Sequence, residues 1–251
     1  MPTWLAAGFW GLVAGIALLI GAAAGYLAPV PRRIIASIMA FGAGVLISAL
    51  AFDLMDEAYR RGGFDSPAYG FLGGAIVYTA ANWFLSRHGA KHRKRSGGQQ
   101  PSESESPGSG LAIVVGSLLD GIPESIAIGV SLISGGSVSV AAVVAIFLSN
   151  LPEGLSAAVG LKKAGRSATY IFGLHTGIVL ISALAALIGY AVFSRLSADV
   201  IAATTAVAAG GILAMLSDTM MPEAFEEAHN IVGLVTVVGF LAAFMLTKLG
   251  G

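Results

Sequence analysis

Eight stretches of apolar residues, each about as long as a membrane-spanning helix, dominate this chain of 251 residues. They lie near residues 4–28, 34–57, 68–86, 111–133, 138–161, 168–193, 198–221 and 231–249. A helix needs about 20 residues to cross the hydrocarbon core of a bilayer. Helices are expected because no hairpin of alternating strands is present and lipid tolerates no open sheet edge. The pattern predicts one all-α membrane domain, residues 1–251, built as a bundle of eight transmembrane helices.

The composition favours the same class. Hydrophobic residues make up 56% of the chain, charged residues only 11%, and the mean hydropathy is +0.82. A soluble domain carries about 25% charged residues, so this chain has too few to cover a water-facing surface. The 34 glycines suit close packing of membrane helices. A net charge of zero suggests no nucleic-acid partner, and the absence of cysteine excludes disulfides and thiolate metal sites.

One long connection, residues 87–110, separates the third and fourth stretches. Its first half is basic and its second half is rich in Gly, Gln, Ser, Pro and Glu, which predicts disorder. Basic residues concentrate on the cytoplasmic side of a membrane protein. With eight spans, ten basic residues lie on the same side of the membrane as this loop: Arg32, Arg33, Arg87, Lys91, Arg93, Lys94, Arg95, Lys162, Lys163 and Arg166. Four lie on the other side: Arg60, Arg61, Arg195 and Lys248. We therefore expect a cytoplasmic loop and two non-cytoplasmic termini.

Two of the apolar stretches carry acidic residues beside a proline. The fourth contains Asp120-Gly-Ile-Pro-Glu124, and the fifth contains Ser149-Asn150-Leu-Pro-Glu153. A charge at mid-bilayer costs about 2.5–3.5 kcal/mol on insertion scales, so it is rarely kept without a use. Proline inside a helix also frees backbone carbonyl oxygens. Aligning the prolines places Glu124 and Glu153 at one level, which predicts a central cation site. Without a cation, at least one carboxylate should be protonated.

Weaker candidates lie elsewhere. Asp53-Leu-Met-Asp56-Glu57 ends the second stretch, and Asp218-Thr-Met-Met-Pro-Glu223 ends the seventh. Related segments in the two halves of a transporter suggest an internal repeat with the site between the halves. Asp53 and Asp218 are therefore candidate ligands, whereas the other acidic residues suit solvated helix ends almost as well. His175, in the sixth stretch, is either a ligand or relay, or a packing residue.

Together these features resemble the Zrt-/Irt-like (ZIP) family of divalent-metal transporters. In that family the fourth span usually reads His-Asn-x-Pro-Glu-Gly, where this chain has Asp120-Gly121-Ile122-Pro123-Glu124-Ser125. The fifth span usually has His or Gln, then Asp or Asn, before x-Pro-Glu-Gly, where this chain has Ser149-Asn150-Leu151-Pro152-Glu153-Gly154. The resemblance implies a site for one or two metal ions at Asp120, Glu124, Ser149, Asn150 and Glu153.

The chain departs from the family in its histidines. Asp53, Asp120 and Ser149 stand at positions where family members have histidine, and no acidic residue stands near Ser182, where many members have a glutamate. Zinc usually takes imidazole or thiolate ligands as well as carboxylates, whereas oxygen ligands suit harder cations such as Mn²⁺. The resemblance thus implies a carrier of divalent transition metals, with zinc as the family default and Mn²⁺, Fe²⁺ and Cd²⁺ as further candidates.

Two other functions are weighed against this one. A proton-coupled carrier of a small organic solute would need aromatic or arginine residues to bind it, and no arginine falls inside a predicted span. An intramembrane aspartyl protease could use Asp53 and Asp120, but the Gly-x-Gly-Asp motif of those enzymes is missing. We therefore expect no enzyme and no prosthetic cofactor. The expected location is a bacterial inner membrane, and the oligomeric state is left open, with a homodimer among the options.

Overall fold

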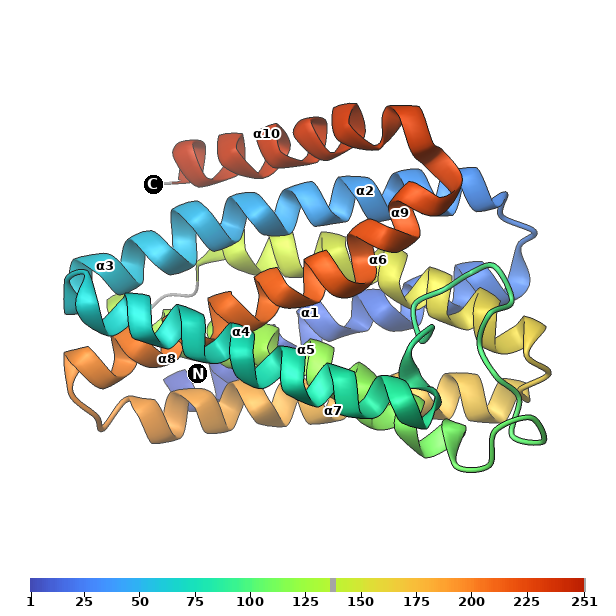
Figure 1. Cartoon of the computed structure of the whole chain (residues 1–251). Coiled ribbons are helices and arrows are strands. Elements are labelled where there is room, and N and C mark those ends of the chain that lie inside the picture. The colour runs from blue at the N-terminus through green and yellow to red at the C-terminus, as the bar shows by residue number, and fades with distance from the viewer. Residues whose placement is uncertain (136–138, 251) are drawn as a thin grey trace.

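The computed structural model describes residues 1–135 and 139–250, and this part of the chain contains helices, turns and loops but no strand (Figure 1). The α-helices are α1 (Thr3–Leu27), α2 (Arg32–Ala49), α3 (Asp56–Gly62), α4 (Asp65–Leu85), α5 (Ser109–Gly135), α6 (Val140–Lys163), α7 (Ala168–Phe193), α8 (Ala198–Met215), α9 (Met221–Ala228) and α10 (Val232–Gly250). The described residues also include three short π-helical segments, η1 (Leu50–Met55), η2 (Ser86–Ala90) and η3 (Leu216–Met220). A 3₁₀ turn, η4 (His229–Ile231), precedes α10.

Six helical stretches in the described residues are long and apolar enough to cross a membrane. They are Thr3–Leu27, Arg32–Gly62, Ser109–Ile133, Val140–Lys163, Ala168–Phe193 and Ala198–Leu249. The predicted count of eight is thus not confirmed. The predicted third span, on α4, is not among the six, and the last stretch holds both the seventh and the eighth predicted spans in 52 residues. The chain turns within that stretch at His229, whose φ is 36°. The described residues thus form an all-helical structure whose long apolar helices are consistent with a membrane protein.

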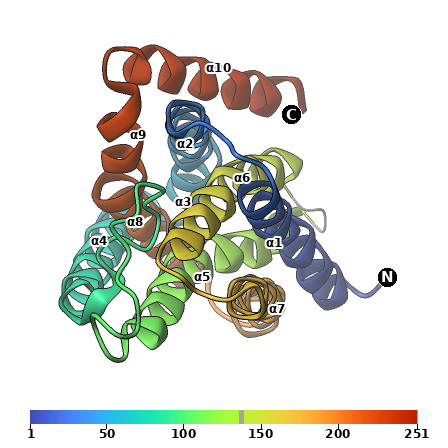
Figure 2. The same cartoon turned by 90° about the vertical axis from the view of Figure 1, so that its right-hand side faces the viewer.

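Viewed end-on, α5 and α6 run through the middle of the bundle, with the other long helices around them (Figure 2). α6 packs against α1 and α2, and α5 packs against α7 and α8, while α10 lies outside against α2. Large apolar side chains point outward from α10, among them Leu234, Val237, Leu241 and Met245. The outer surface is therefore suited to lipid, whereas Asp120, Glu124 and Glu153 on the two proline-bearing helices are buried.

Glycines allow the helix backbones to approach closely. A Cβ atom at Gly154 of α6 would lie 2.1 Å from the Leu18 carbonyl oxygen of α1, and one at Gly21 of α1 would lie 2.0 Å from that of Leu151. Each helix thus presents a glycine to the other's backbone, which is how small residues bring membrane helices together. This contact fixes the position of α6, and with it Glu153.

Every helix that carries a predicted acidic ligand has either a proline or a π-helical segment near that residue. Pro123 lies inside α5 and Pro152 inside α6. Asp53 lies in η1 and Asp218 in η3. Proline removes one backbone hydrogen bond of a helix, and a π-helical turn is a local irregularity that often marks a functional site.

The connection 87–110 differs from the disordered loop that its composition predicts. It lies at the end of the bundle opposite the two termini and folds back onto it (Figure 1). Arg93, Lys94, Ser96 and Gln100 are each at most 3% exposed. The Gln100 side-chain amide donates to the carbonyl oxygens of Arg93 and Ala157, at 2.9 and 3.3 Å. Composition could not predict this docking because the partners of the basic residues lie inside the bundle.

The contact between α1 and α6 gives a test of the packing. Replacing Gly154 with alanine should destabilise the protein by about 1–3 kcal/mol, because the added methyl group meets backbone that cannot move aside. Gly173→Ala is the matched control, since a Cβ there has no neighbour within 4 Å. Unfolding in mixed detergent micelles measures both. Equal stability of the two variants would contradict the close α1–α6 contact.

Candidate functional site

α5 and α6 bring three of the predicted acidic ligands into the interior. Asp120 and Glu124 lie one turn apart on α5 and are each 1% exposed, and Glu153 on α6 is 7% exposed. Asp120 and Glu153 contact the same ammonium group, that of Lys94, and Glu124 lies one turn from Asp120 on α5, so we treat the three carboxyl groups as one cluster. We call these three residues the carboxylate cluster.

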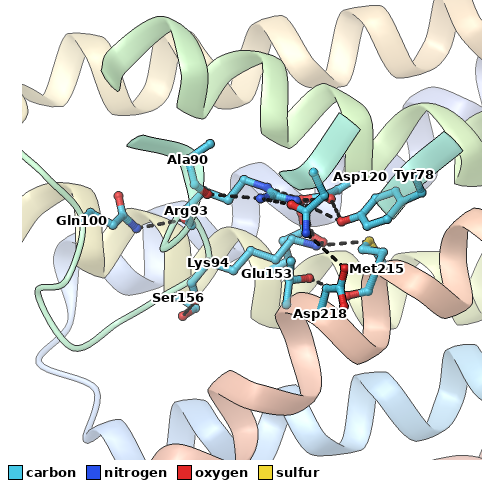
Figure 3. Close-up of polar contacts among 12 residues, drawn as sticks. Tyr78, Ala90, Arg93, Lys94, Gln100, Asp120, Glu153, Ser156, Met215 and Asp218 are labelled. Atoms are coloured by element: carbon cyan, nitrogen blue, oxygen red, sulfur yellow. Dashed lines mark hydrogen bonds and ion pairs between the residues drawn. The ribbon is translucent and has the colours of Figure 1, made fainter. Parts of the chain in front are cut away.

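Two basic residues of the 87–110 connection reach into this cluster (Figure 3). The Arg93 guanidinium donates Nε to Asp120 Oδ2 and Nη2 to Asp120 Oδ1, both at 2.7 Å. Its remaining donors bind Tyr78, Asn82 and the Ala90 carbonyl oxygen. All five N–H groups of the guanidinium are thereby satisfied. A two-bond arginine–carboxylate pair of this kind is among the strongest polar contacts in proteins.

Lys94 lies between the two helices. Its ammonium nitrogen is 2.8 Å from Glu153 Oε2, 3.3 Å from Asp120 Oδ2 and 3.2 Å from the Met215 sulfur. Burial disfavours the charged form of Lys94, but the carboxylates of Asp120 and Glu153 outweigh that effect and raise its pKa above the usual value. The ammonium group therefore stays charged at neutral pH and bridges α5 and α6.

Tyr78 and Asn82 of α4 complete the surroundings of Asp120. The Tyr78 hydroxyl, 2% exposed as a residue, donates to Asp120 Oδ1 at 2.6 Å. The Asn82 amide accepts from Arg93 and donates to Asp218 Oδ2 at 3.2 Å. Asp218 thus belongs to the same network through Asn82, although it lies at the exposed edge of it.

Glu124 is the exception in this network. Both of its carboxyl oxygens are buried, and neither has a hydrogen-bond partner among the described residues. A buried ionised carboxylate without a partner is costly, so the group requires either a proton or a cation. Glu124 interacts electrostatically with Glu153 and Lys94. It is the member of the carboxylate cluster whose carboxyl oxygens still lack a hydrogen-bond partner in the described residues.

The other predicted ligands lie outside the cluster. Ser149 Oγ donates to the Ile146 carbonyl oxygen of its own helix, and Asn150 Nδ2 donates to the Ala14 carbonyl oxygen of α1 at 3.0 Å. His175 Nδ1 lies 2.7 Å from the Ile171 carbonyl oxygen of its own helix. These three side chains are engaged with helix backbones.

Asp53 lies at a different level of the bundle. It accepts a hydrogen bond from Thr247 of α10 at 3.3 Å and lines a cavity of about 1010 Å³. Ala127, one turn beyond Glu124 on α5, lines the same cavity. Ala127 thus brings the wall of this cavity to within one helical turn of Glu124, although Asp120, Glu124 and Glu153 are not among the residues that line it.

No group of three or more His, Cys, Asp or Glu side chains is positioned to hold a metal ion in the part of the chain that the structure describes. The cations that contact Asp120 and Glu153 are those of Arg93 and Lys94. Sequence reasoning missed these two residues, together with Tyr78 and Asn82. A usable signal was present, since buried carboxylates need partners and the connection before α5 is rich in basic residues.

Comparison with known proteins found no matching family model and no matching curated protein.

The Arg93–Asp120 pair can be tested by a double-mutant cycle. Arg93→Met leaves Asp120 with a buried and poorly compensated charge and should cost about 3–5 kcal/mol of stability. Arg93→Met combined with Asp120→Asn should cost less than the two single changes added together. The exposed Arg60–Asp56 pair is the control and should show at most about 1 kcal/mol. Additive effects at Arg93 and Asp120, measured by unfolding in mixed micelles, would mean that the pair contributes no coupling.

Proposed function

We propose that this protein carries divalent transition-metal cations across a membrane, and that the carboxylate cluster is its central binding site. The observation that carries the proposal is Glu124, a buried carboxyl group whose two oxygens have no hydrogen-bond partner in the described residues. A membrane protein rarely keeps such a group unless it binds an ion or a proton. The short motifs around Pro123 and Pro152, which resemble the ZIP family, agree with this function.

The proposed architecture has eight spans. In it α4 crosses the membrane as an additional helix, since it is 21 residues long and packs along α8. The stretch Ala198–Leu249 crosses twice, because the turn at His229 separates α8 and α9 from α10. The occurrence of Asp53 and Asp218 in two π-helical segments supports an internal repeat.

A route for the cation follows from the cavity. We infer that a cation enters beside Asp53, passes Ala127 and reaches Glu124 and Glu153. Ser149 and Asn150 would become ligands only if they exchanged their present backbone hydrogen bonds for the cation. The carboxylates favour Mn²⁺ and Fe²⁺, while the Met215 sulfur beside Lys94 is a soft donor that suits Cd²⁺. Zinc is the metal implied by the family resemblance.

The carrier of an organic solute is the second candidate. The predicted spans contain no arginine, but Arg93 enters the bundle from the 87–110 connection. All five donors of its guanidinium are already used within the protein, so it offers nothing to an anionic solute. The metal carrier is therefore favoured.

Glu124→Gln tests the proposed site. The change keeps the shape of the side chain but removes its charge, so uptake of Mn²⁺ or Zn²⁺ into proteoliposomes should fall by about tenfold or more. Glu105→Gln is the matched control, because Glu105 is exposed in the 87–110 connection. Normal uptake by a well-folded Glu124→Gln variant would exclude Glu124 as a ligand.

The proposed orientation is tested with single cysteines, which the chain lacks. In intact cells, an impermeant maleimide should label Ser197→Cys, at the start of α8, but not Ser104→Cys in the 87–110 connection. Both positions are exposed in the protein, so only the membrane distinguishes them. Labelling of the cysteine at position 104 would reverse the assignment of sides.

A further inference from the structure

We propose that Arg93 and Lys94 are a tethered substitute for the transported cation, so that docking of their segment and binding of a divalent metal ion exclude each other. The segment from Arg93 to Gln100 is called the plug below. This inference rests on the proposed function and adds a regulatory device to it. The carboxylates that would bind the metal are the ones that the plug occupies.

The first argument is geometric. The Lys94 ammonium group contacts one carboxylate on α5 and one on α6, and a sulfur on α8, all within 3.3 Å. A metal ion bridging the same two helices would need the same carboxylate oxygens, Asp120 Oδ2 and Glu153 Oε2. The two cations cannot share that position, because like charges at such short separation repel strongly.

The second argument is charge. Arg93 and Lys94 bring two positive charges to the cluster, the same charge as one divalent cation. Exchanging one for the other leaves the net charge of the interior unchanged. Losing the plug without a replacement would leave buried carboxylates unpaired, which is strongly unfavourable. Release of the plug is therefore expected to accompany the binding of a divalent cation, which restores the two positive charges.

The third argument is that the plug has its own docking site, separate from the carboxylate cluster. Glu223 of α9, 1% exposed, accepts from the Ser96 backbone N–H at 2.9 Å and from the Ser96 hydroxyl at 2.7 Å. Ser156 Oγ of α6 donates to the Lys94 carbonyl oxygen. Gly160 of α6 gives room, since a Cβ there would lie 2.0 Å from the Arg95 carbonyl oxygen. These contacts hold the plug in one register.

The plug closes only one end of the bundle. It lies at the end away from the termini (Figure 1), whereas the cavity beside Asp53 is lined by Ala127, Val130 and Ser131, which follow Glu124 on α5. A cation arriving through the cavity would meet Glu124, the carboxyl group that the plug leaves without a partner. Binding there and displacement of Lys94 would open the closed end, which couples cation occupancy to release on the loop side.

Three variants test the competition. Lys94→Met removes the ammonium group at similar length, Glu223→Gln weakens the docking of Ser96 at a distance from the cluster, and Lys91→Met alters an exposed lysine of the same connection. Mn²⁺ binding is measured at equilibrium on purified protein. The docked state is measured by the rate of maleimide labelling of Ser156→Cys, whose side chain lies beneath the plug. This substitution removes the Ser156 hydrogen bonds to Lys94 and Glu223, so it is introduced into the parent and into every variant alike and only their relative rates are compared.

Competition predicts linked results. If the plug is docked in about nine molecules of ten, Lys94→Met and Glu223→Gln should bind Mn²⁺ about tenfold more tightly than the parent, and Lys91→Met should not differ. The cysteine at position 156 should be labelled faster in both variants. In the parent, Mn²⁺ should accelerate labelling.

Two outcomes would overturn the proposal, and they are distinguishable. If Mn²⁺ binds the parent and both variants with equal affinity, the plug does not compete, while the proposed function stands. If neither the parent nor the variants bind Mn²⁺, Zn²⁺ or Cd²⁺, the proposed function fails and the plug proposal fails with it. A misfolded Lys94→Met does not remove the test, because Glu223→Gln leaves the cluster unchanged.

Discussion

A buried charge must be neutralised, and in this protein that requirement connects the fold, the loop and the candidate site. The three carboxyl groups of the carboxylate cluster lie inside a bundle whose outer surface is apolar. Asp120 and Glu153 are neutralised by Arg93 and Lys94, which arrive from outside the bundle on a connecting segment. The third, Glu124, has no partner in the described residues. Glycine contacts between α1 and α6 fix the position of the helix that carries Glu153.

The sequence predicted the scaffold well because hydrophobic length is a local property. The apolar stretches and the prolines of the fourth and fifth stretches led directly to α5 and α6, and the one-turn spacing of Asp120 and Glu124 placed both on the face that is buried. The number of membrane spans was harder to predict from the sequence. α4 carries polar residues such as Asn82 because it contributes to the polar network, and those residues make it less apolar than a simple span.

The site was predicted only in part, for a physical reason. Asp120, Glu124 and Glu153 could be found because an acidic residue in an apolar stretch is conspicuous. Arg93 and Lys94 lie in a polar, basic connection, and this composition predicts a segment exposed to solvent. Only tertiary structure shows that their charges are paired with α5 and α6. The motif around Pro152 did not predict the contact that Asn150 makes, a hydrogen bond to the Ala14 carbonyl oxygen of a neighbouring helix.

The central claim is that a divalent cation and Lys94 occupy the same place between Asp120 and Glu153. The most direct measurement is a pair of crystal structures, one grown with Zn²⁺ and one without, with anomalous data at the zinc edge. The account predicts an anomalous peak between α5 and α6, about 2.0–2.2 Å from oxygens of Asp120 and Glu153, with the Lys94 ammonium group moved out of the cluster. A structure at saturating Zn²⁺ in which Lys94 still binds Glu153, and no peak lies between α5 and α6, would contradict it.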